Sequence, residues 1–319
     1  MSRVKEFELF YENEMNTKDI DVHIWMSNYL VDRLELNDDQ ILWFCFLTSI
    51  TYHLPTAYMI INEYPDLELV DEDRLREWWL EVQKRCPFQK DKLQQREYLP
   101  DTIISYQKMV GSSGQKAYFD KLLTGTPAEN FNVLYDTVYK DIAHFGRFST
   151  WNWTQSLKQI FGYNLEPELL FLGEKNAESI THGMCYALGN DAWAKKERYV
   201  EDGKRKKKVH KFVQSEKDHL EYNAQRIMQT ITNRGVEIDP FYLETVLCAF
   251  KKTLRTNDSR YVGYYNDRMA EDILSIENNG FDGVDWSILW DARNESLQKE
   301  LINSGVNKTK FKLSLSEKI

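Results

Sequence analysis

The spacing of apolar residues along the chain is mostly that of helices. Ile20, Ile24, Ser27, Val31 and Leu34 follow one another at steps of four and three residues, which places them on one face of an amphipathic helix. The same reasoning predicts further helices, which cover residues 38–54, 72–85, 115–123, 128–143, 149–161, 177–188, 215–234, 241–254, 264–277 and 286–302. Because no segment shows a clear strand pattern, the sequence predicts an all-α fold.

Several helix ends carry recognisable capping residues. Asn37 and Gln40 have the spacing of a capping box, and Pro55 must kink or restart the helix that follows. Asp239 and Pro240 suit the cap and the first position of another helix. We therefore expect one helical unit over residues 1–303, with an N-terminal and a C-terminal lobe, a basic loop at about 199–213 and a polar tail at 304–319.

Composition and charge exclude several classes of protein. With 319 residues, 42% of them hydrophobic and 29% charged, the chain can bury a full core and is not a disordered chain. Its net charge of −9 gives no general attraction for nucleic acid. Basic charge is concentrated in one segment, which includes Lys204, Arg205, Lys206, Lys207 and Lys208. These residues either contact DNA phosphates or form a solvated loop.

The cysteines and the apolar segments bear on location. The four cysteines lie far apart without zinc-ligand spacing, which is typical of reduced thiols in a cytoplasm. Residues 1–14 are too charged for a signal peptide. The longest apolar run, residues 41–61, contains His53 and Pro55, so a broken, buried core helix is expected there instead of a membrane span.

Common catalytic motifs are absent, including the phosphate loop, G-x-G-x-x-G, H-E-x-x-H and G-x-S-x-G. The segment 144–153 instead combines a glycine turn with Arg147, Trp151 and Trp153 near a helix start. This arrangement suits either the binding of a phosphate and a flipped base, or two core indoles at an ordinary helix start.

Two more clusters could carry chemistry. Glu178, His182 and Tyr186 lie at helical spacing, so a carboxylate, an imidazole and a phenol share one face that could hold a proton near neutral pH. A structural histidine is the alternative. The second cluster could recognise a polyphosphate or a DNA backbone, or could be a structural corner with surface ion pairs. It consists of Arg260, Tyr264, Tyr265, Asp267 and Arg268.

Three stretches together resemble a known family: Trp43 with 52–58 and 62–65, then 145–148, then 183–189. They are similar to the bacteriophage amino acid:DNA transferases, the α-glutamyl/putrescinyl thymine pyrophosphorylase group. The resemblance covers about residues 20–272 and implies distant kinship with helix-hairpin-helix DNA glycosylases and with the helical domain of 5-hydroxymethyluracil DNA kinases. The L-P-G-[VI]-G signature of the glycosylases is missing, and Leu170-Phe171-Leu172-Gly173 is only a faint echo of it.

The resemblance implies a reaction in which an amino acid or polyamine displaces pyrophosphate from 5-pyrophosphoryloxymethyl-deoxyuridine in double-stranded phage DNA, after a separate kinase has acted. It implies that Arg147, Arg260 and Arg268 serve the leaving group, that Trp151 or Tyr264 stacks on the base, and that His182 or Asp267 takes the proton. No cofactor is implied except Mg²⁺ with the pyrophosphate, and the expected location is the cytoplasm of an infected bacterial host. A non-catalytic DNA-binding module that serves a DNA kinase, and a base-excising glycosylase, are the alternatives.

Overall fold

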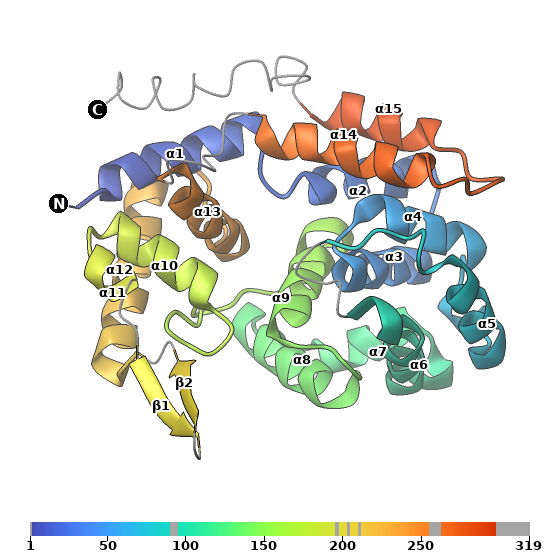
Figure 1. Cartoon of the computed structure of the whole chain (residues 1–319), viewed down its shortest axis with the longest axis horizontal. Helices are drawn as coiled ribbons and strands as arrows, with labels where there is room; N and C mark the ends of the chain where they lie inside the picture. Colours follow the sequence, from blue (N-terminus) through green and yellow to red (C-terminus); the bar gives the residue numbers. More distant parts are fainter. Residues whose placement is uncertain are drawn as a thin grey trace. The chain divides into compact units, whose positions relative to one another are not determined.

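The computed structural model describes residues 2–89, 95–194, 198–202, 205–209, 212–254 and 263–297 (Figure 1). Nearly all regular structure in these ranges is helical, which confirms the all-α prediction. The chain forms two compact units where one unit of two lobes was expected. Unit 1 comprises residues 1–21, 168–264 and 303–319, and unit 2 comprises residues 22–167 and 265–302. The tail at 304–319 lies outside the described residues.

Unit 2 is built from helices on both sides of the segment that belongs to unit 1. Its elements are α2 (Val22–Arg33), α3 (Asp38–Thr51), α4 (Leu54–Glu63), η1 (Leu67–Leu69), α5 (Glu72–Val82), α6 (Leu99–Val110), η3 (Gly111–Ser113), α7 (Gln115–Leu122), α8 (Pro127–Asp141), α9 (Arg147–Ser156), the π-helical η4 (Leu157–Phe161), α14 (Tyr264–Glu277) and α15 (Ser287–Ser296).

Helix α3 is the centre of unit 2. It packs against α4, α7 and α9, and its residues from Leu42 to Thr51 are all buried (Figure 1). Trp43, Phe46 and Tyr106 stack there in nearly parallel planes. The apolar run at 41–61 is therefore a buried core segment, as expected from the sequence. None of the described helices has the length and apolar character needed to cross a membrane.

The break between α3 and α4 has a defined local cause. Helix α3 begins with the predicted capping box, in which Asn37 and Gln40 each bond the other's backbone N–H. It ends at Tyr52, which adopts the left-handed conformation with φ of 45°. His53 then caps α4, and Pro55 occupies the first turn of that helix, where a missing N–H costs nothing. The chain therefore turns at residues 52–53 in the middle of the apolar core.

Unit 1 contains five described helices and one hairpin. The helices are α1 (Val4–Thr17), α10 (Glu178–Ala187), α11 (Asp191–Ala194), α12 (Gln214–Asn233) and α13 (Pro240–Thr253). Helix α1 was not predicted from the sequence pattern, because its many charges mask a buried face. That face includes Phe7 and Phe10, whose rings contact Phe250 of α13 at 5.3 and 5.6 Å between centroids.

Helices α10 and α13 pack unusually closely at Gly183. A Cβ atom built on this glycine would lie 2.0 Å from the carbonyl oxygen of Leu247, a distance that no real side chain tolerates. Glycine is therefore required by the approach of the two backbones at this point. The third stretch of the family resemblance, residues 183–189, begins at this residue.

The basic segment is a hairpin where a loop was expected. Strands β1 (Arg198–Asp202) and β2 (Arg205–Val209) pair antiparallel, with Arg198 opposite Val209 and Asp202 opposite Arg205. The loop prediction was wrong for these residues because runs of lysine are poor in β-propensity and give no strand signal. Lys204 and Lys211 lie outside the described residues.

Candidate active site

The residues singled out by the sequence are divided between the two units. Unit 2 holds Arg147, Trp151, Trp153, Tyr265, Asp267 and Arg268. Unit 1 holds His182, Tyr186, Tyr264, Arg205, Lys206, Lys207 and Lys208, the last four in β2. Arg260 and Lys204 lie outside the described residues.

Arg147 is the first residue of α9 and is almost completely buried, with 8% of its surface exposed. Its guanidinium lies over the Trp151 ring, 5.5 Å from the centroid, in a cation–π arrangement. Burial raises the pKa of the nearby Tyr135, and the charge of Arg147 opposes that rise. The predicted pairing of an arginine with an indole is therefore present in the fold.

Trp153 belongs to the core of unit 2. It is 0% exposed, and its ring meets those of Phe46, Tyr106, Phe119 and Phe145 in edge-to-face contacts of 5.3 to 5.8 Å. Such contacts give a ring a fixed place and a large buried area. The stacking role predicted for Trp153 is not tested directly, but the core role accounts for all of these contacts.

The start of α9 contacts the break between α3 and α4. The Phe148 ring meets the Tyr52 ring at 5.2 Å, and His23 of α2 meets Tyr52 from another direction at 5.0 Å. Burial lowers the pKa of His23 to about 4, so this imidazole is neutral at physiological pH. Two of the three stretches that carry the family resemblance thus meet at the contact between Tyr52 and Phe148.

His53 is held in one tautomer by its surroundings. The hydroxyl of Thr56 donates to the carbonyl of Pro87 at 2.6 Å, and the Thr56 N–H donates to Nδ1 of His53 at 3.2 Å. Since Nδ1 accepts, the proton of the neutral ring lies on Nε2. Burial, together with the charge of Arg268, lowers the pKa of His53 to about 3.

The Nε2 atom of His53 lies 3.8 Å from a carboxylate oxygen of Asp272, on α14. Because His53 is neutral, this is an electrostatic contact longer than a hydrogen bond and not an ion pair. The same oxygen of Asp272 accepts a hydrogen bond from Nε of Arg268, one turn earlier, at 3.2 Å. Burial raises the pKa of Asp272 to about 6, although Arg268 counteracts the rise.

These three residues form what we call the His53 cluster: His53, Asp272 and Arg268. Access to it is graded, because His53 is buried while the side chains of Asp272 and Arg268 are 21% and 44% exposed. Asp272 changes its charge close to neutral pH, and the partly exposed guanidinium of Arg268 is a group that binds anions. The sequence analysis named Arg268 but missed Asp272, although an acid four residues after an arginine on a helix was a readable signal.

The neighbours of the other predicted residues on α14 favour structural roles. Burial lowers the pKa of Arg293 on α15, and the charge of Asp267 opposes that effect. Arg293 also donates from Nε to the carbonyl of Asn266 at 3.3 Å. Tyr265 packs against the hydrophobic core of unit 2. Asp267 thus helps to balance a buried guanidinium, while its predicted role as proton acceptor stays a prediction.

In unit 1, a second polar cluster joins α10 to α13. Lys251 donates a short hydrogen bond to the Ser179 hydroxyl, whose oxygen also lies 2.8 Å from the sulfur of Cys248. His182 is on the next turn of α10, and the carbonyl of Tyr186 accepts a hydrogen bond from Arg3 at 2.7 Å. The predicted row of polar residues along α10 is therefore tied into the fold at both ends.

The chemistry of cysteine and of metal ligands is limited in the described residues. All four cysteines are free thiols, and burial raises the pKa of Cys86 and of Cys185 to about 12. Within the described ranges, no group of three or more His, Cys, Asp or Glu residues is arranged to hold a metal ion. A Mg²⁺ ion carried by pyrophosphate would need fewer protein ligands, and that expectation stays a prediction.

The fold and the His53 cluster define a helical protein with the features of an enzyme. The chain belongs to the amino acid:DNA transferase family, whose model matches residues 16–259. It is also 25% identical, over 271 residues, to a serinyltransferase of Salmonella phage ViI. That alignment covers 82% of this chain and 64% of the relative, so the chain spans less than two thirds of that protein. No solved structure gives a significant match.

The family match includes some of the candidate residues and not others. His53, Arg147 and His182 lie within residues 16–259, whereas Arg268 and Asp272 follow that range. The His53 cluster thus joins a residue of the family region to a helix beyond it. The assignment of the cluster rests on its geometry in this chain.

Proposed function

We propose that this protein transfers an amine onto modified thymine in phage DNA. The observation that carries the proposal is the match to the amino acid:DNA transferase family over residues 16–259, which span most of both units. The serinyltransferase of Salmonella phage ViI supports an amino acid as the donor. The DNA substrate would be 5-pyrophosphoryloxymethyl-deoxyuridine, supplied by a separate DNA kinase.

The reaction is a displacement at the exocyclic methylene carbon of the base. An ammonium group first loses a proton, and its nitrogen lone pair then forms a bond to that carbon. The bond from the carbon to the pyrophosphate oxygen breaks, and its electron pair leaves with pyrophosphate. The new nitrogen–carbon bond leaves a base that is heavier by the amine, in a DNA strand that remains intact.

Two arginines of unit 2 are placed for the leaving group in this proposal. Arg268 is partly exposed and directed by Asp272, while Arg147 is stacked on Trp151. A guanidinium stabilises the charge that develops on a departing phosphate, and a fixed guanidinium does so with little reorganisation. Asp272 acts here as a positioning residue, because only its ionised form holds Arg268. Mg²⁺ would arrive with the pyrophosphate.

The proton acceptor and the DNA contacts keep the assignments made from the sequence. His182 and Asp267 are the proposed alternatives for the proton, and Trp151 or Tyr264 would stack on the flipped base. Strand β2 would add phosphate contacts through its basic residues, with Arg260 and Lys204 as further candidates. The proposal thus uses residues from both units of the chain.

Nucleoside mass spectrometry tests this function directly. DNA that carries pyrophosphorylated 5-hydroxymethyluracil is incubated with the protein and a mixture of amino acids and polyamines, then digested to nucleosides. A base heavier by one amine supports the transferase and identifies the donor. Abasic sites would instead indicate a glycosylase, and unchanged DNA that is still bound by folded protein would indicate a binding module. Either result contradicts the proposal.

A further inference from the structure

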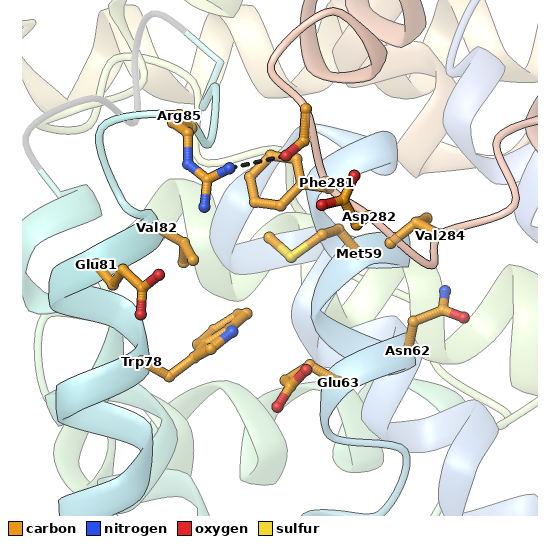
Figure 2. A pocket seen from close by; sticks show the side chains of 11 residues that line it. Met59, Asn62, Glu63, Trp78, Glu81, Val82, Arg85, Phe281, Asp282 and Val284 are labelled. Carbon is orange, nitrogen blue, oxygen red and sulfur yellow. Dashed lines mark hydrogen bonds between the residues drawn. The ribbon is translucent and has the colours of Figure 1, made fainter.

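Unit 2 contains a pocket that none of the predicted site residues lines. It lies between the end of α4, helix α5 and the loop that follows α14, and has a volume of about 300 Å³ (Figure 2). This size is at the lower end for pockets that hold small molecules. Asn62 and Glu63 belong to the first stretch of the family resemblance, so that stretch reaches from His53 at one end of α4 to this pocket at the other.

The lining carries three carboxylates and one guanidinium. Glu63, Glu81 and Asp282 contribute the negative charges and Arg85 the positive one, which leaves a net charge of 1 − 3 = −2. Such a site repels the phosphates of DNA and the pyrophosphate group, and attracts ammonium compounds. The pocket therefore differs in charge preference from the arginines proposed for the leaving group.

Arg85 is fixed at one end of the pocket. Its guanidinium lies over the Phe281 ring, 4.5 Å from the centroid, and Nη1 donates to the carbonyl of Gly280 at 2.9 Å. The side-chain amide of Asn279 in turn donates to the carbonyl of Arg85 at 2.6 Å. A guanidinium has five N–H donors, and the hydrogen bonds to other described residues use only Nη1, so Nε and Nη2 can bind a carboxylate.

The rest of the lining suits an ammonium group. Trp78 presents its indole to the pocket, and its ring is held from behind by Tyr64 at 5.2 Å (Figure 2). An indole face attracts a cation, and a nearby carboxylate adds a charge-assisted hydrogen bond. Figure 2 shows the carboxylate of Glu81 beside this indole, with Arg85 and Glu63 at opposite ends of the pocket.

We propose that this pocket binds the amine donor as an α-amino acid, with its ammonium group between Trp78 and the carboxylates of Glu81 and Glu63 and its carboxylate on Arg85. This inference rests on the proposed function, because it takes the donor class from that function. A zwitterion matches a site that offers both signs of charge, whereas a diamine would leave the guanidinium of Arg85 opposite a cation.

The position of the pocket is compatible with a displacement reaction. Helix α14 carries Arg268 in its first half, and the loop after that helix, residues 280–284, forms one wall of the pocket. In a displacement at carbon, the amine and the leaving group lie on opposite sides of the reacting atom. A leaving-group site and a donor site at different points along α14 satisfy this requirement in outline.

Direct binding in the absence of DNA tests the pocket. L-serine and putrescine are titrated into the full-length protein and followed by calorimetry, with the variants Glu81→Gln and Arg85→Gln. We expect Glu81→Gln to weaken both ligands about tenfold, which corresponds to roughly one charge-assisted hydrogen bond. We expect Arg85→Gln to weaken L-serine about tenfold and to leave putrescine unchanged. Equal affinities in wild type and both variants, or no binding of either amine to wild type, overturn the proposal.

Controls separate a local effect on amine binding from a loss of the fold. Glu77 is exposed, one turn before Glu81 on α5 and outside the pocket, so Glu77→Gln makes the same chemical change and should bind both amines like wild type. Because Arg85 also ties down the loop at 279–281, Asp282→Asn provides a second charge variant without that structural role. Each variant is compared with wild type by thermal unfolding.

The outcomes for the pocket and for the proposed function can be told apart. Amine binding that depends on Glu81, together with DNA that gains no new base, would contradict the transferase and retain the pocket. A new base formed with the same donor KM in wild type and in Glu81→Gln would retain the transferase and overturn the pocket. A raised donor KM with an unchanged DNA KM supports both.

Discussion

The carboxylate of Asp272 lies between two cationic or potentially cationic side chains and yet has a raised pKa. It accepts a hydrogen bond from Arg268 at 3.2 Å and faces Nε2 of His53 at 3.8 Å, but burial raises its pKa to about 6. His53 gives no compensating charge because it is neutral. The hold of Asp272 on Arg268 therefore depends on pH close to neutrality.

The first prediction concerns the pH dependence of transfer. As pH falls through about 6, Asp272 becomes protonated and its charge no longer holds Arg268, so kcat should fall with an apparent pKa near 6. In Asp272→Asn, kcat should be roughly tenfold lower than in wild type at pH 7.5, and the step near pH 6 should be absent. A pH series of single-turnover rates checks this. The same step in the variant would assign the titration to another group.

The second prediction concerns stability. The folded-state pKa of Asp272 is above its unfolded value, so the group stabilises the fold at low pH, and this contribution is lost as pH rises from about 4 to 6. Asp272→Asn should thus gain up to about 3 kcal/mol relative to wild type between pH 4 and pH 7. His53 has the opposite slope but is present in both proteins, so it cancels in the difference. Urea unfolding at the two pH values measures the change, and a variant that becomes less stable relative to wild type as pH rises would contradict it.

The sequence predicted local features better than it predicted the site. The Asn37–Gln40 capping box, the restart at Pro55 and the helix at 264–277 follow from residues close together in the chain, and all three are present. Helices α1 and α6 were missed because charge or flanking prolines obscure their apolar faces. The His53 cluster was beyond reach, because residues 53 and 272 are brought together only by the packing of α14 against the core of unit 2.

The third prediction uses the close packing of α10 and α13. In Gly183→Ala, the new methyl group would overlap the carbonyl of Leu247, and backbone atoms of both helices would have to move. We expect a loss of more than about 2 kcal/mol in the free energy of unfolding. Gly146→Ala is the control, because a Cβ there meets no atom within 4 Å and its φ of −88° is ordinary for alanine. Equal stabilities of the two variants would show that α10 can shift without cost.

The fourth prediction concerns Arg147. Replacement by alanine removes the guanidinium from Trp151 and from the proposed leaving-group site, so kcat should fall by about 10² to 10³. Arg147→Lys keeps a charge but lacks the planar fork, and it should recover only part of the rate. Circular dichroism at the assay temperature distinguishes this effect from unfolding. Unchanged turnover in folded Arg147→Ala would remove the residue from the site.

The last prediction concerns the basic hairpin. Strand β2 brings four consecutive basic residues, Arg205 to Lys208, into a paired strand within a chain of net charge −9. If they contact DNA phosphates, neutralising two of them, as in Lys206→Gln/Lys207→Gln, should reduce the slope of log K against log salt by about 0.9 for each phosphate that is no longer neutralised. The matched control is Lys108→Gln/Lys121→Gln in unit 2, which removes the same charge from α6 and α7. Filter binding to duplex DNA across a salt series gives both slopes. A general charge effect would lower them equally, whereas a local interaction lowers only the slope of the hairpin variant, because counterions are released only where protein and phosphate meet.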